Sequence, residues 1–471
     1  MIFTLDGQLR LTDCPAALRR KLMDELTVQN PAYVDALRLG RPTWGIPREL
    51  LLYKVDNNEL ILPRGMAMRV WQDRPRDAQR RDAMTLLPAS DWPESGIALR
   101  VYQQQAADNI LHNRIPQGVL VMPCGAGKTE TGLYIIHRLG QPALWIAHTK
   151  DLVQQTFDRA RERLGLTGDQ LGMLCGGVRR LGTHLTVATV QTLYHMELDE
   201  LAGKFGTVVV DECQHVVNNP TNAEMFNRVL AELPARYRYG LTASPGRGDG
   251  LEHTIYQILG DPLYTVDQRT LGEAGSVITP TVQPVYTGFT YEPSGREAEH
   301  IDVNRLRSFM AADKNRRELL FSLIEKELCG GHTCLVLGCT LGMLGILNDH
   351  FSMRWKSRFI CGSTKQQERA AALKELREGG ADVLFATYQL AKEGLDIPRA
   401  DRLILAQPVR DSVAVQQSVG RIMRPAPGKT DAVVLDLVDV AVPSCKSQYS
   451  ARRRVYKKLQ ANILKEENYN V

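Results

Sequence analysis

The chain has 471 residues, of which 44% are hydrophobic and 24% are charged, and its formal net charge is +5. A chain of this length is too long for a single hydrophobic core, so we expect roughly two to four domains. The composition is that of a globular protein rather than of a disordered or fibrous chain. No apolar run approaches the roughly 18 residues of a membrane span, and the N-terminal MIFTLDGQLR lacks the layout of a signal peptide. We therefore expect a soluble intracellular protein.

Residues 1–70 predict a small α+β domain. One helix is expected to begin near Pro15 and run through KLMDELTV, and a second is expected to begin at Pro31. FTLDGQLRLT predicts a strand or hairpin, and apolar runs on either side of residues 56–58 predict another hairpin. Residues 71–96 mix charges with prolines and are interpreted as a linker.

Beyond residue 96, short apolar runs alternate with amphipathic stretches, which is typical of parallel sheets covered by helices. The first series comprises GVLVMP, ALWIAH, LTVAT, TVVVD and YGLTAS. The second comprises HTCLVLG, SRFICG, DVLFAT, DRLILA and DAVVLDL, and ITPTVQPVYTGFTYE between the two looks extended. The sequence thus predicts an α/β fold with tandem parallel-sheet domains at 97–266 and 267–440.

Residues 441–471 carry seven lysines and arginines against two glutamates. SARRRVYKKLQANILKEENY predicts an amphipathic helix with Val455, Leu459 and Ile463 as its packing stripe. Its basic residues are expected to face either solvent alone or a polyanion. The basic run contains three consecutive arginines, Arg452, Arg453 and Arg454.

Nine cysteines are scattered along the chain without a C-x-x-C pair. The even spacing of Cys329, Cys334 and Cys339 leaves an iron–sulfur site as one alternative. TCLVLGCT, however, has the pattern of a buried strand, in which Cys334 and Cys339 point to opposite faces. This pattern favours reduced thiols without a metal.

GVLVMPCGAGKTE places a glycine-rich loop between a strand and a helix. Gly125 and Gly127 let backbone N–H groups turn toward phosphate oxygens, and the helix that follows adds its positive N-terminal end. Lys128 is expected to reach the β- and γ-phosphates of a nucleotide, and Thr129 to bind Mg²⁺. Met122 stands where the general pattern has its first glycine, so a glycine-rich turn without nucleotide is the alternative.

VVVDECQHVV sets two carboxylates at the end of an apolar strand. A buried carboxylate is unfavourable unless something compensates it. Since parallel sheets bind ligands at the carboxyl ends of their strands, Asp211 is expected to bind Mg²⁺ and Glu212 to orient or deprotonate the attacking water. With the glycine-rich loop, this motif predicts an ATPase.

VQQSVGRIMRP places Gln417, Arg421 and Arg424 on one face of a predicted helix in the second α/β domain. Arginines supplied by a partner domain stabilise the charge on a transferred γ-phosphate. We expect that role here, and a solvated salt-bridge face is the alternative.

With these motifs the chain resembles superfamily 2 helicases and translocases over roughly residues 97–440. The resemblance is carried by LRVYQQQA, CGAGKT (motif I), AHTKDLVQQ (Ia), ATVQTL (Ib), DECQ (II), LTASPGR (III), LVLGCT (IV), ATYQLAKEGLDIP (V) and QQSVGRIMR (VI). LRVYQ, GLTASPGRGDG and EGLDIP are most similar to the XPB-like group, which includes phage branch-migration helicases of the UvsW type. Motif II departs from the DEAH form at Gln214, which could contact motif III or VI instead.

The resemblance implies two RecA-like domains that hold ATP and Mg²⁺ between them. It implies catalytic roles for Lys128, Asp211, Glu212, Gln417, Arg421 and Arg424, with Thr129 and Asp211 as metal ligands. It implies nucleotide contacts from Gln103, Cys124, Gly125, Ala126, Gly127, Lys128, Thr129, Glu130, Gly394 and Asp396. Nucleic-acid contacts are expected from His148, Thr149, Thr189, Gln191, Thr192, Thr340, Thr387, Arg452, Arg453 and Arg454.

The function implied is that of a monomeric DNA-dependent ATPase that unwinds or remodels branched or forked DNA. We expect it in the cytoplasm of a bacterial or phage-infected cell, with replication or recombination proteins as candidate partners. Two alternatives stay open, an ATP-gated DNA clamp that recruits partners without moving, and an RNA helicase. NPAY, RPTWGIPR and LPRG resemble the N-terminal module of phage-type helicases, so residues 1–70 either contact DNA or serve packing alone.

Overall fold

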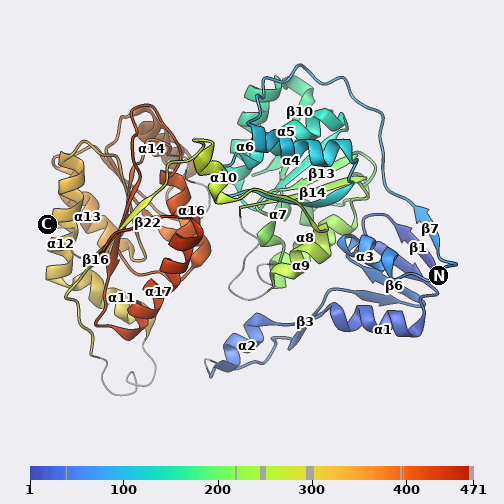
Figure 1. Ribbon diagram of the computed structural model, residues 1–471, viewed down its shortest axis with the longest axis horizontal. Coiled ribbons are helices and arrows are strands. Elements are labelled where there is room, and N and C mark those ends of the chain that lie inside the picture. The colour runs from blue at the N-terminus through green and yellow to red at the C-terminus, as the bar shows by residue number, and fades with distance from the viewer. Residues whose placement is uncertain are drawn as a thin grey trace. The chain divides into compact units, whose positions relative to one another are not determined.

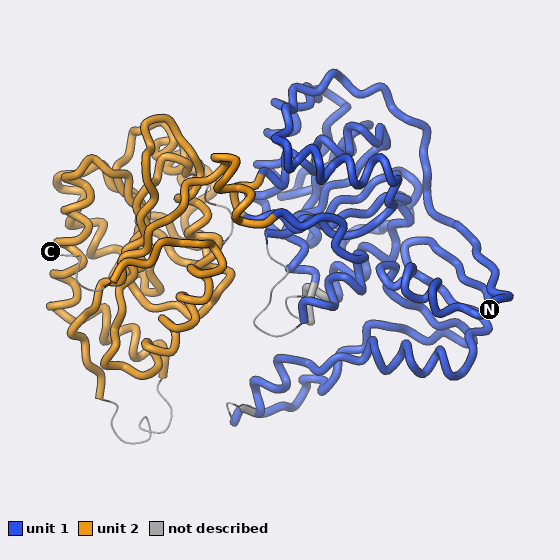
Figure 2. The backbone as a smooth tube through the Cα atoms, viewed as in Figure 1, with its two compact units in different colours: residues 1–123, 127–266 blue, residues 124–126, 267–471 orange. Residues whose placement is uncertain are grey.

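The computed structural model describes residues 1–38, 40–217, 220–243, 251–292, 302–392, 395 and 397–465. These residues form two compact units, shown in Figure 2. Unit 1 comprises residues 1–123 and 127–266, and unit 2 comprises residues 124–126 and 267–471. In the described part of the chain, no helix is long and apolar enough to cross a membrane.

Unit 1 begins with a small α+β module that precedes the first α/β domain (Figure 1). Its main sheet has the strand order β5-β6-β2-β1-β7, and β3 and β4 form a separate ribbon. The strands are β1 (Ile2–Leu5), β2 (Leu9–Thr12), β3 (Thr27–Gln29), β4 (Glu49–Leu51), β5 (Lys54–Asp56), β6 (Glu59–Leu62) and β7 (Gln79–Asp82). The helices are α1 (Ala16–Glu25), α2 (Pro31–Arg38), the 3₁₀ helix η1 (Arg64–Met66) and α3 (Ala67–Gln72).

The structure corrects two expectations for this module. Residues 71–96 are not only a linker, because β7 pairs in parallel with β1 and so belongs to the module's sheet. Helix α1 ends at Glu25 rather than running through KLMDELTV, because the next residues form β3 and pair with β4. Both predicted hairpins are confirmed, as β1 with β2 and β5 with β6.

The module packs tightly on the α/β domain that follows it. A Cβ atom on Gly7, in the β1–β2 turn, would lie 1.9 Å from the carbonyl oxygen of Ala231. A Cβ atom on Gly65 would lie 2.4 Å from the carbonyl oxygen of Gln257. Buried leucines of the module join one hydrophobic cluster with residues of the α/β domain. The module is therefore seated on its neighbour through close backbone contacts.

The first α/β domain is a sheet of order β11-β10-β12-β9-β13-β14-β8-β15, antiparallel only between β10 and β11. Its strands are β8 (Gln117–Val121), β9 (Ala143–Ala147), β10 (Leu171–Cys175), β11 (Val178–Arg180), β12 (Leu185–Thr189), β13 (Thr207–Val210), β14 (Tyr237–Thr242) and β15 (Pro262–Thr265). Its helices are α4 (Val101–His112), α5 (Lys128–Leu139), α6 (Lys150–Leu164), α7 (Val190–Tyr194), α8 (Pro220–Ala231) and α9 (Glu252–Leu259), with 3₁₀ helices η2 (Gly168–Gln170) and η3 (Cys213–Val217). The five predicted strands are confirmed as β8, β9, β12, β13 and β14.

Unit 2 contains an all-parallel sheet of order β18-β19-β17-β20-β21-β16-β22. Its strands are β16 (Thr281–Tyr286), β17 (Cys334–Gly338), β18 (Ser357–Ile360), β19 (Val383–Thr387), β20 (Arg402–Leu405), β21 (Val433–Val438) and β22 (Asn462–Ile463). Its helices are α10 (Gln268–Glu273), α11 (Val303–Ala312), α12 (Lys314–Cys329), α13 (Leu341–Ser352), α14 (Gln366–Glu378), α15 (Tyr388–Lys392), α16 (Ser412–Ile422) and α17 (Pro443–Lys458). Helices α12 and α13 lie on one face of this sheet and α16 and α17 on the other (Figure 1). The second predicted series of strands is confirmed, and TVQPVY is extended as β16.

Candidate nucleotide site and nucleic-acid surfaces

The glycine-rich loop lies between β8 and α5, as the sequence predicts. Gly125 and Gly127 have φ angles of 84° and 78°, in the region that favours glycine. A Cβ atom on Gly127 would lie 2.2 Å from Nε2 of Gln103, so a side chain here would displace the Gln103 amide. Nε2 of Gln103 donates to the carbonyl oxygen of Gly127 at 3.4 Å, and Oε1 of Gln103 accepts from the backbone N–H of Arg100. The predicted base reader therefore lies directly beside the loop.

Lys128, Thr129 and Glu130 form the first turn of α5, where a helix offers its unpaired N–H groups. The side chains of Lys128 and Thr129 are only partly buried. Glu130 points elsewhere, because its carboxylate pairs with Arg159 at 3.4 Å and Arg163 at 3.7 Å, both on α6. The structure thus pairs Glu130 with α6, and its nucleotide contact stays a prediction.

Motif II lies at the carboxyl end of β13, between the strand ends of β9 and β14. Nζ of Lys128 lies 3.3 Å from Oε1 of Glu212, so the loop lysine and the motif II glutamate are paired. The backbone N–H of Glu212 donates to Oδ1 of Asp211 at 2.9 Å. Glu212 has a φ of 46°, a strained value for a residue with a side chain. The sharp turn holds both carboxylates beside the loop.

A hydrogen-bonded chain extends from Glu212 to motif III. Nε2 of Gln214 donates to Oε2 of Glu212 at 2.7 Å. Oγ1 of Thr242, at the end of β14, donates to Oε1 of Gln214 at 2.7 Å. The residue that departs from the DEAH form therefore bridges motif II to motif III, one of the two contacts that the sequence left open. The rest of motif III, residues 244–247, lies outside the described residues.

The two carboxylates have opposite pKa shifts. Burial raises the pKa of Asp211 to about 6, and the charge of Glu212 adds to this rise while Lys128 opposes it. Burial also acts to raise the pKa of Glu212, but Lys128 and the hydrogen bond from Gln214 outweigh it and hold that pKa at about 2. Glu212 is therefore an ionised group in a fixed ion pair. Asp211 is a buried carboxyl group whose charge is incompletely compensated, as a metal-binding carboxylate is before it binds its cation.

Motifs Ia and Ib lie side by side, because β9 and β12 are paired up to Ala147 and Thr189. Oγ1 of Thr149 caps α6 by accepting from the N–H of Leu152 at 3.3 Å. Oγ1 of Thr189 caps α7 and lies 2.8 Å from Oγ1 of Thr192. Thr189 is buried, so it positions Thr192 rather than reaching a ligand itself, which corrects its predicted role.

Gln191 and His148 complete this edge of the sheet. Nε2 of Gln191, which is exposed, donates to the carbonyl oxygen of His148 at 3.1 Å. The ring of His148 stacks on that of His215, with the centroids 3.8 Å apart. His215 follows the motif II turn in η3, so the stack joins motif Ia to motif II.

Motif VI forms the last part of α16, which begins at Ser412 with Asp411 as its cap. Gln417 and Arg421 are four residues apart in this helix, but the helix ends at Ile422 and Arg424 follows it. The prediction that all three share one helical face is therefore wrong for Arg424. Oε1 of Gln417 and Nε of Arg421 are buried and have no hydrogen-bond partner among the residues that the structure describes.

In unit 2, β17 and β19 pair in register at Gly338 and Thr387, so Thr387 ends β19 and Thr340 lies just beyond the neighbouring end of β17. Thr340 is held by Gln407, whose Oε1 accepts from the N–H of Thr340 at 2.9 Å and from its hydroxyl at 3.2 Å. Gly394 and Asp396 of motif V lie outside the described residues.

Two family descriptions match the chain in the expected order. "Type III restriction enzyme, res subunit" matches residues 96–247, which contain motifs I and II, and "Helicase conserved C-terminal domain" matches residues 315–426, which contain motif VI. A putative ATP-dependent RNA helicase of Acanthamoeba polyphaga mimivirus is 27% identical over 396 residues, which are 80% of this chain and 71% of that protein. A DNA 3'-5' helicase XPB of Kineococcus radiotolerans is 28% identical over 354 residues, which are 72% of this chain.

The two family matches and the XPB relative bear out the resemblance to superfamily 2 helicases. The XPB relative bears out the likeness to the XPB-like group, although the chain spans only 59% of that protein's length. A solved structure of S. cerevisiae Dbp5 bound to RNA and ADP BeF3 matches 78% of this chain and 90% of that chain, at 17% identity and a TM-score of 0.57. That likeness confirms the tandem RecA-like fold. The helicase family matches and the relatives named as helicases, and not this fold likeness, support an ATP-dependent helicase.

The C-terminal helix of the helicase differs from its prediction. Helix α17 ends at Lys458, and Ile463 lies in strand β22 instead of continuing the packing stripe. Arg452 is only 1% exposed, and its guanidinium pairs with the buried carboxylate of Asp436 at 2.8 Å. Its predicted contact with nucleic acid is therefore wrong. Arg453 and Arg454 are exposed, as predicted.

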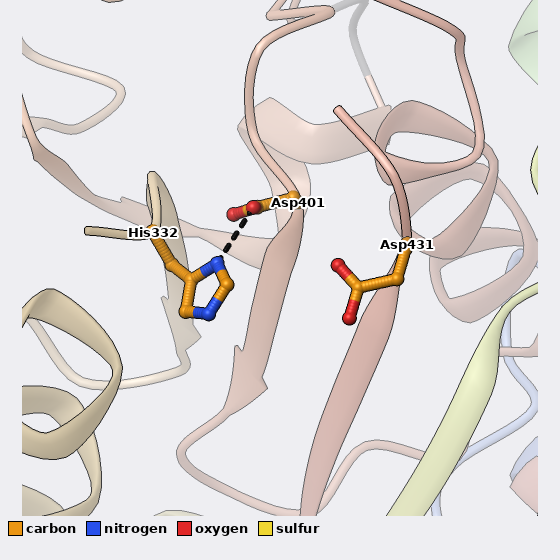
Figure 3. Close-up of side chains that lie close together, drawn as sticks. All are labelled: His332, Asp401 and Asp431. Carbon is orange, nitrogen blue, oxygen red and sulfur yellow. Dashed lines mark hydrogen bonds and ion pairs between the residues drawn. The ribbon is translucent and has the colours of Figure 1, made fainter. Parts of the chain in front are cut away.

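The described part of the helicase has one cluster of residue types that can bind a metal ion, His332, Asp401 and Asp431 (Figure 3). Nδ1 of His332 lies 2.8 Å from Oδ2 of Asp401. Arg402 donates to Oδ1 of Asp431 at 2.8 Å and lies 2.7 Å from Nε2 of His332. Because a guanidinium already occupies these ligand atoms, we interpret the cluster as an ion-pair network rather than a metal site.

Sequence reasoning missed Gln407 and Lys429, which hold the motifs of unit 2 in place. Nζ of Lys429 donates to the carbonyl oxygens of Pro398, Ala400 and Arg424, at 3.1, 2.7 and 2.9 Å. It thereby ties the segment after motif V to the end of motif VI. Burial lowers the pKa of Lys429 to about 8. No sequence signal identifies such residues, because their partners are mostly backbone atoms.

Proposed function

We propose that this helicase hydrolyses ATP with Mg²⁺ to unwind or remodel branched or forked DNA. The observation that carries the proposal is the chain of contacts Lys128–Glu212–Gln214–Thr242. It joins the phosphate loop, the catalytic motif and motif III within unit 1. A change at the nucleotide can therefore be transmitted to the neighbouring strand ends, where motifs Ia and Ib lie.

The residues around the loop fit a magnesium nucleotide. Backbone N–H groups at Gly125 and Gly127 suit phosphate oxygens, and Lys128 supplies a positive charge. Thr129 and Asp211 offer the oxygen ligands that Mg²⁺ prefers. Bound there, the cation would neutralise the charge that develops on the phosphoryl group. The raised pKa of Asp211 supports this assignment, since a cation beside the carboxylate would lower it again.

Glu212 is proposed to orient and deprotonate the attacking water. Its carboxylate is bound on one oxygen by Lys128 and on the other by Gln214. When phosphate oxygens attract Lys128, Glu212 keeps its orientation through Gln214 while one oxygen becomes available to water. Hydrolysis is also proposed to require Arg421 and Arg424 of unit 2, which would stabilise charge on the γ-phosphate.

Thr149, Gln191 and Thr192 are proposed to contact the sugar–phosphate backbone of the strand. Hydroxyl groups and helix N-termini suit phosphates and carry no base information, so we expect weak sequence preference and a strong dependence on salt. DNA is the favoured substrate, because the XPB relative is named as a DNA helicase. RNA is the second candidate, because the mimivirus relative is named as an RNA helicase.

An unwinding assay distinguishes these possibilities. Matched forks of DNA and RNA with the same sequence are offered with ATP, and Glu212→Gln serves as the control that binds nucleotide without hydrolysing it. The proposal predicts strand separation on the DNA fork that is lost in the variant. Faster unwinding of the RNA fork would move RNA to first place. A Glu212→Gln variant that keeps its cellular function would favour a clamp that needs only ATP binding.

A further inference from the structure

Unit 1 contains a pocket where the N-terminal module meets the first α/β domain. Its cavity volume is about 80 Å³, and part of the pocket is open to solvent. The module contributes the β1–β2 turn and the segments around β4, β5 and β6, and the α/β domain contributes α8, α9 and the start of β14. Of the described residues that line the pocket, three have cationic side chains, Lys54, Arg64 and Arg238, and none has a carboxylate.

Arg64 is buried at the base of the module. Its guanidinium donates to Oε1 of Gln117 at 2.7 Å and to the carbonyl oxygens of Asp6 and Ala235, at 3.2 and 2.6 Å. Gln117 returns a hydrogen bond to the backbone of Arg64 at 2.9 Å. All of these acceptors are uncharged, so Arg64 has no direct counter-ion among the residues that the structure describes.

Arg238, at the start of β14, is also buried, and it lines the pocket from the α/β domain. One of its terminal nitrogens donates to the carbonyl oxygens of Gly7, Leu230 and Leu233, at 3.1, 2.7 and 2.8 Å. Each arginine is only 1% exposed. Two buried guanidinium groups therefore hold the module and the α/β domain together without a carboxylate between them.

Each arginine also has one nitrogen that makes no hydrogen bond to the described residues. Nη2 of Arg64 and Nε of Arg238 are buried and have no hydrogen-bond partner within the described ranges. The carboxylates that act on Arg64 through space are committed elsewhere, since Asp6 pairs with Arg10 at 2.8 Å and Asp82 with Arg236 at 2.9 Å. Burying an uncompensated charge is costly, and leaving its N–H groups unpaired adds to that cost.

The pKa values of Arg64 and Arg238 are both lowered by burial, as expected for buried positive charges with little compensation. Burial lowers the pKa of Arg64 to about 10, and Asp6 and Asp82 offset only part of that effect. Burial lowers the pKa of Arg238 far below its usual range, and the charge of Arg64 lowers it further. Guanidinium groups stay protonated in proteins, so both sites gain from a bound anion.

We propose that this pocket binds a phosphate group between Arg64 and Arg238, with Lys54 at its mouth. A tetrahedral oxyanion with several acceptor oxygens suits two guanidinium groups better than a chloride ion does, because arginine pairs with phosphate through several N–H groups at once. Lys54 is exposed, so the rest of a phosphorylated ligand can remain in solvent. The phosphate is either free phosphate or the terminal phosphate of a nucleic-acid strand. The site is separate from the nucleotide loop and adds to the proposed function.

The test measures thermal unfolding of the full chain in phosphate and in chloride at equal ionic strength. A saturating non-hydrolysable ATP analogue is present, so that the phosphate loop is occupied. At a phosphate concentration ten times the dissociation constant, the unfolding midpoint is expected to rise by about 3 °C. Lys54→Met and Arg64→Lys are expected to weaken phosphate binding several-fold, and Arg20→Met, an exposed change on α1 outside the pocket, to leave it unaltered.

Lys54→Met keeps the test decisive if Arg64→Lys does not fold, since Lys54 is exposed. A phosphate response equal to that of chloride overturns the proposal, and so does a response that the Lys54 change leaves intact. A second arm compares one oligonucleotide with and without a 5′-phosphate. Tighter binding of the phosphorylated strand that depends on Lys54 identifies a strand end as the ligand, and equal binding of both strands together with a phosphate response identifies free phosphate.

Discussion

Asp211 offers a test in which activity and stability are expected to move in opposite directions. The carboxyl group is only 4% exposed, and burial raises its pKa from 3.8 to about 6. The change Asp211→Asn removes the charge and keeps the shape. The new amide oxygen can still accept the hydrogen bond that the N–H of Glu212 donates at 2.9 Å.

The direction in which stability changes with pH follows from proton binding by Asp211. Between pH 3.8 and 6 the folded state holds the Asp211 proton more tightly than the unfolded chain does, so stability falls as the pH rises through this window. Above pH 6 the loss is complete. A shift of roughly two pKa units corresponds to about 3 kcal/mol. Asp211→Asn is therefore expected to raise the free energy of unfolding of unit 1 by up to about 3 kcal/mol at pH 8, and by about half of that at pH 5.

The assay is urea unfolding without Mg²⁺ or nucleotide, followed by tryptophan fluorescence. Four of the five tryptophans lie in unit 1, so the signal reports mainly on the unit that contains Asp211. The same variant is expected to lose ATP hydrolysis. Glu212→Gln is the matched control, because Lys128 holds the pKa of Glu212 at about 2 and its charge therefore stabilises the fold above pH 4.5. An Asp211→Asn protein less stable than wild type at pH 8 would show that the Asp211 charge does not destabilise the fold.

Three further changes test the contacts described above. Gln214→Ala is expected to lower kcat for ATP hydrolysis about tenfold, which is the equivalent of one hydrogen bond of about 1.4 kcal/mol, with nucleotide affinity nearly unchanged. Gln214→His is expected to recover part of the rate. An unaltered kcat contradicts the bridging role of Gln214. Arg452→Met leaves the carboxylate of Asp436 buried without its ion-pair partner. The change is expected to lower the free energy of unfolding, measured in urea, by about 3–5 kcal/mol. A stability like that of wild type would show that the pair is dispensable. Charge reversal of Arg453 and Arg454 to glutamate is expected to weaken DNA binding and to reduce the slope of log affinity against log salt by about one unit per residue; an unchanged slope places both side chains away from the strand.

Local sequence signals predicted the nucleotide site because its parts are close to strand ends. A glycine-rich loop after β8 and a carboxylate after β13 must meet at one edge of a parallel sheet, and the Lys128–Glu212 pair confirms this. Gln214 was singled out for breaking the expected motif, but its contact with Thr242 depends on β14 lying beside β13.

Other features could not be read from the chain in the same way. Strand β7 is exposed at every position, so it has no apolar pattern, and only its pairing with β1 reveals it. Arg452 lies three residues before Val455 and thus shares the buried face of α17. An arginine in a basic run suggests a side chain exposed to solvent. Arg452 is buried because the tertiary fold brings the carboxylate of Asp436 next to its guanidinium.

Steady-state ATP hydrolysis is the most direct measurement of an ATPase that nucleic acid stimulates. The purified chain is assayed without nucleic acid and with single-stranded DNA, duplex DNA, a four-way DNA junction and single-stranded RNA, with Lys128→Ala as the control. We expect slow basal hydrolysis, strong stimulation by forked or four-way DNA, and loss of activity in the variant. Hydrolysis that no nucleic acid stimulates, or that persists in Lys128→Ala, would contradict it.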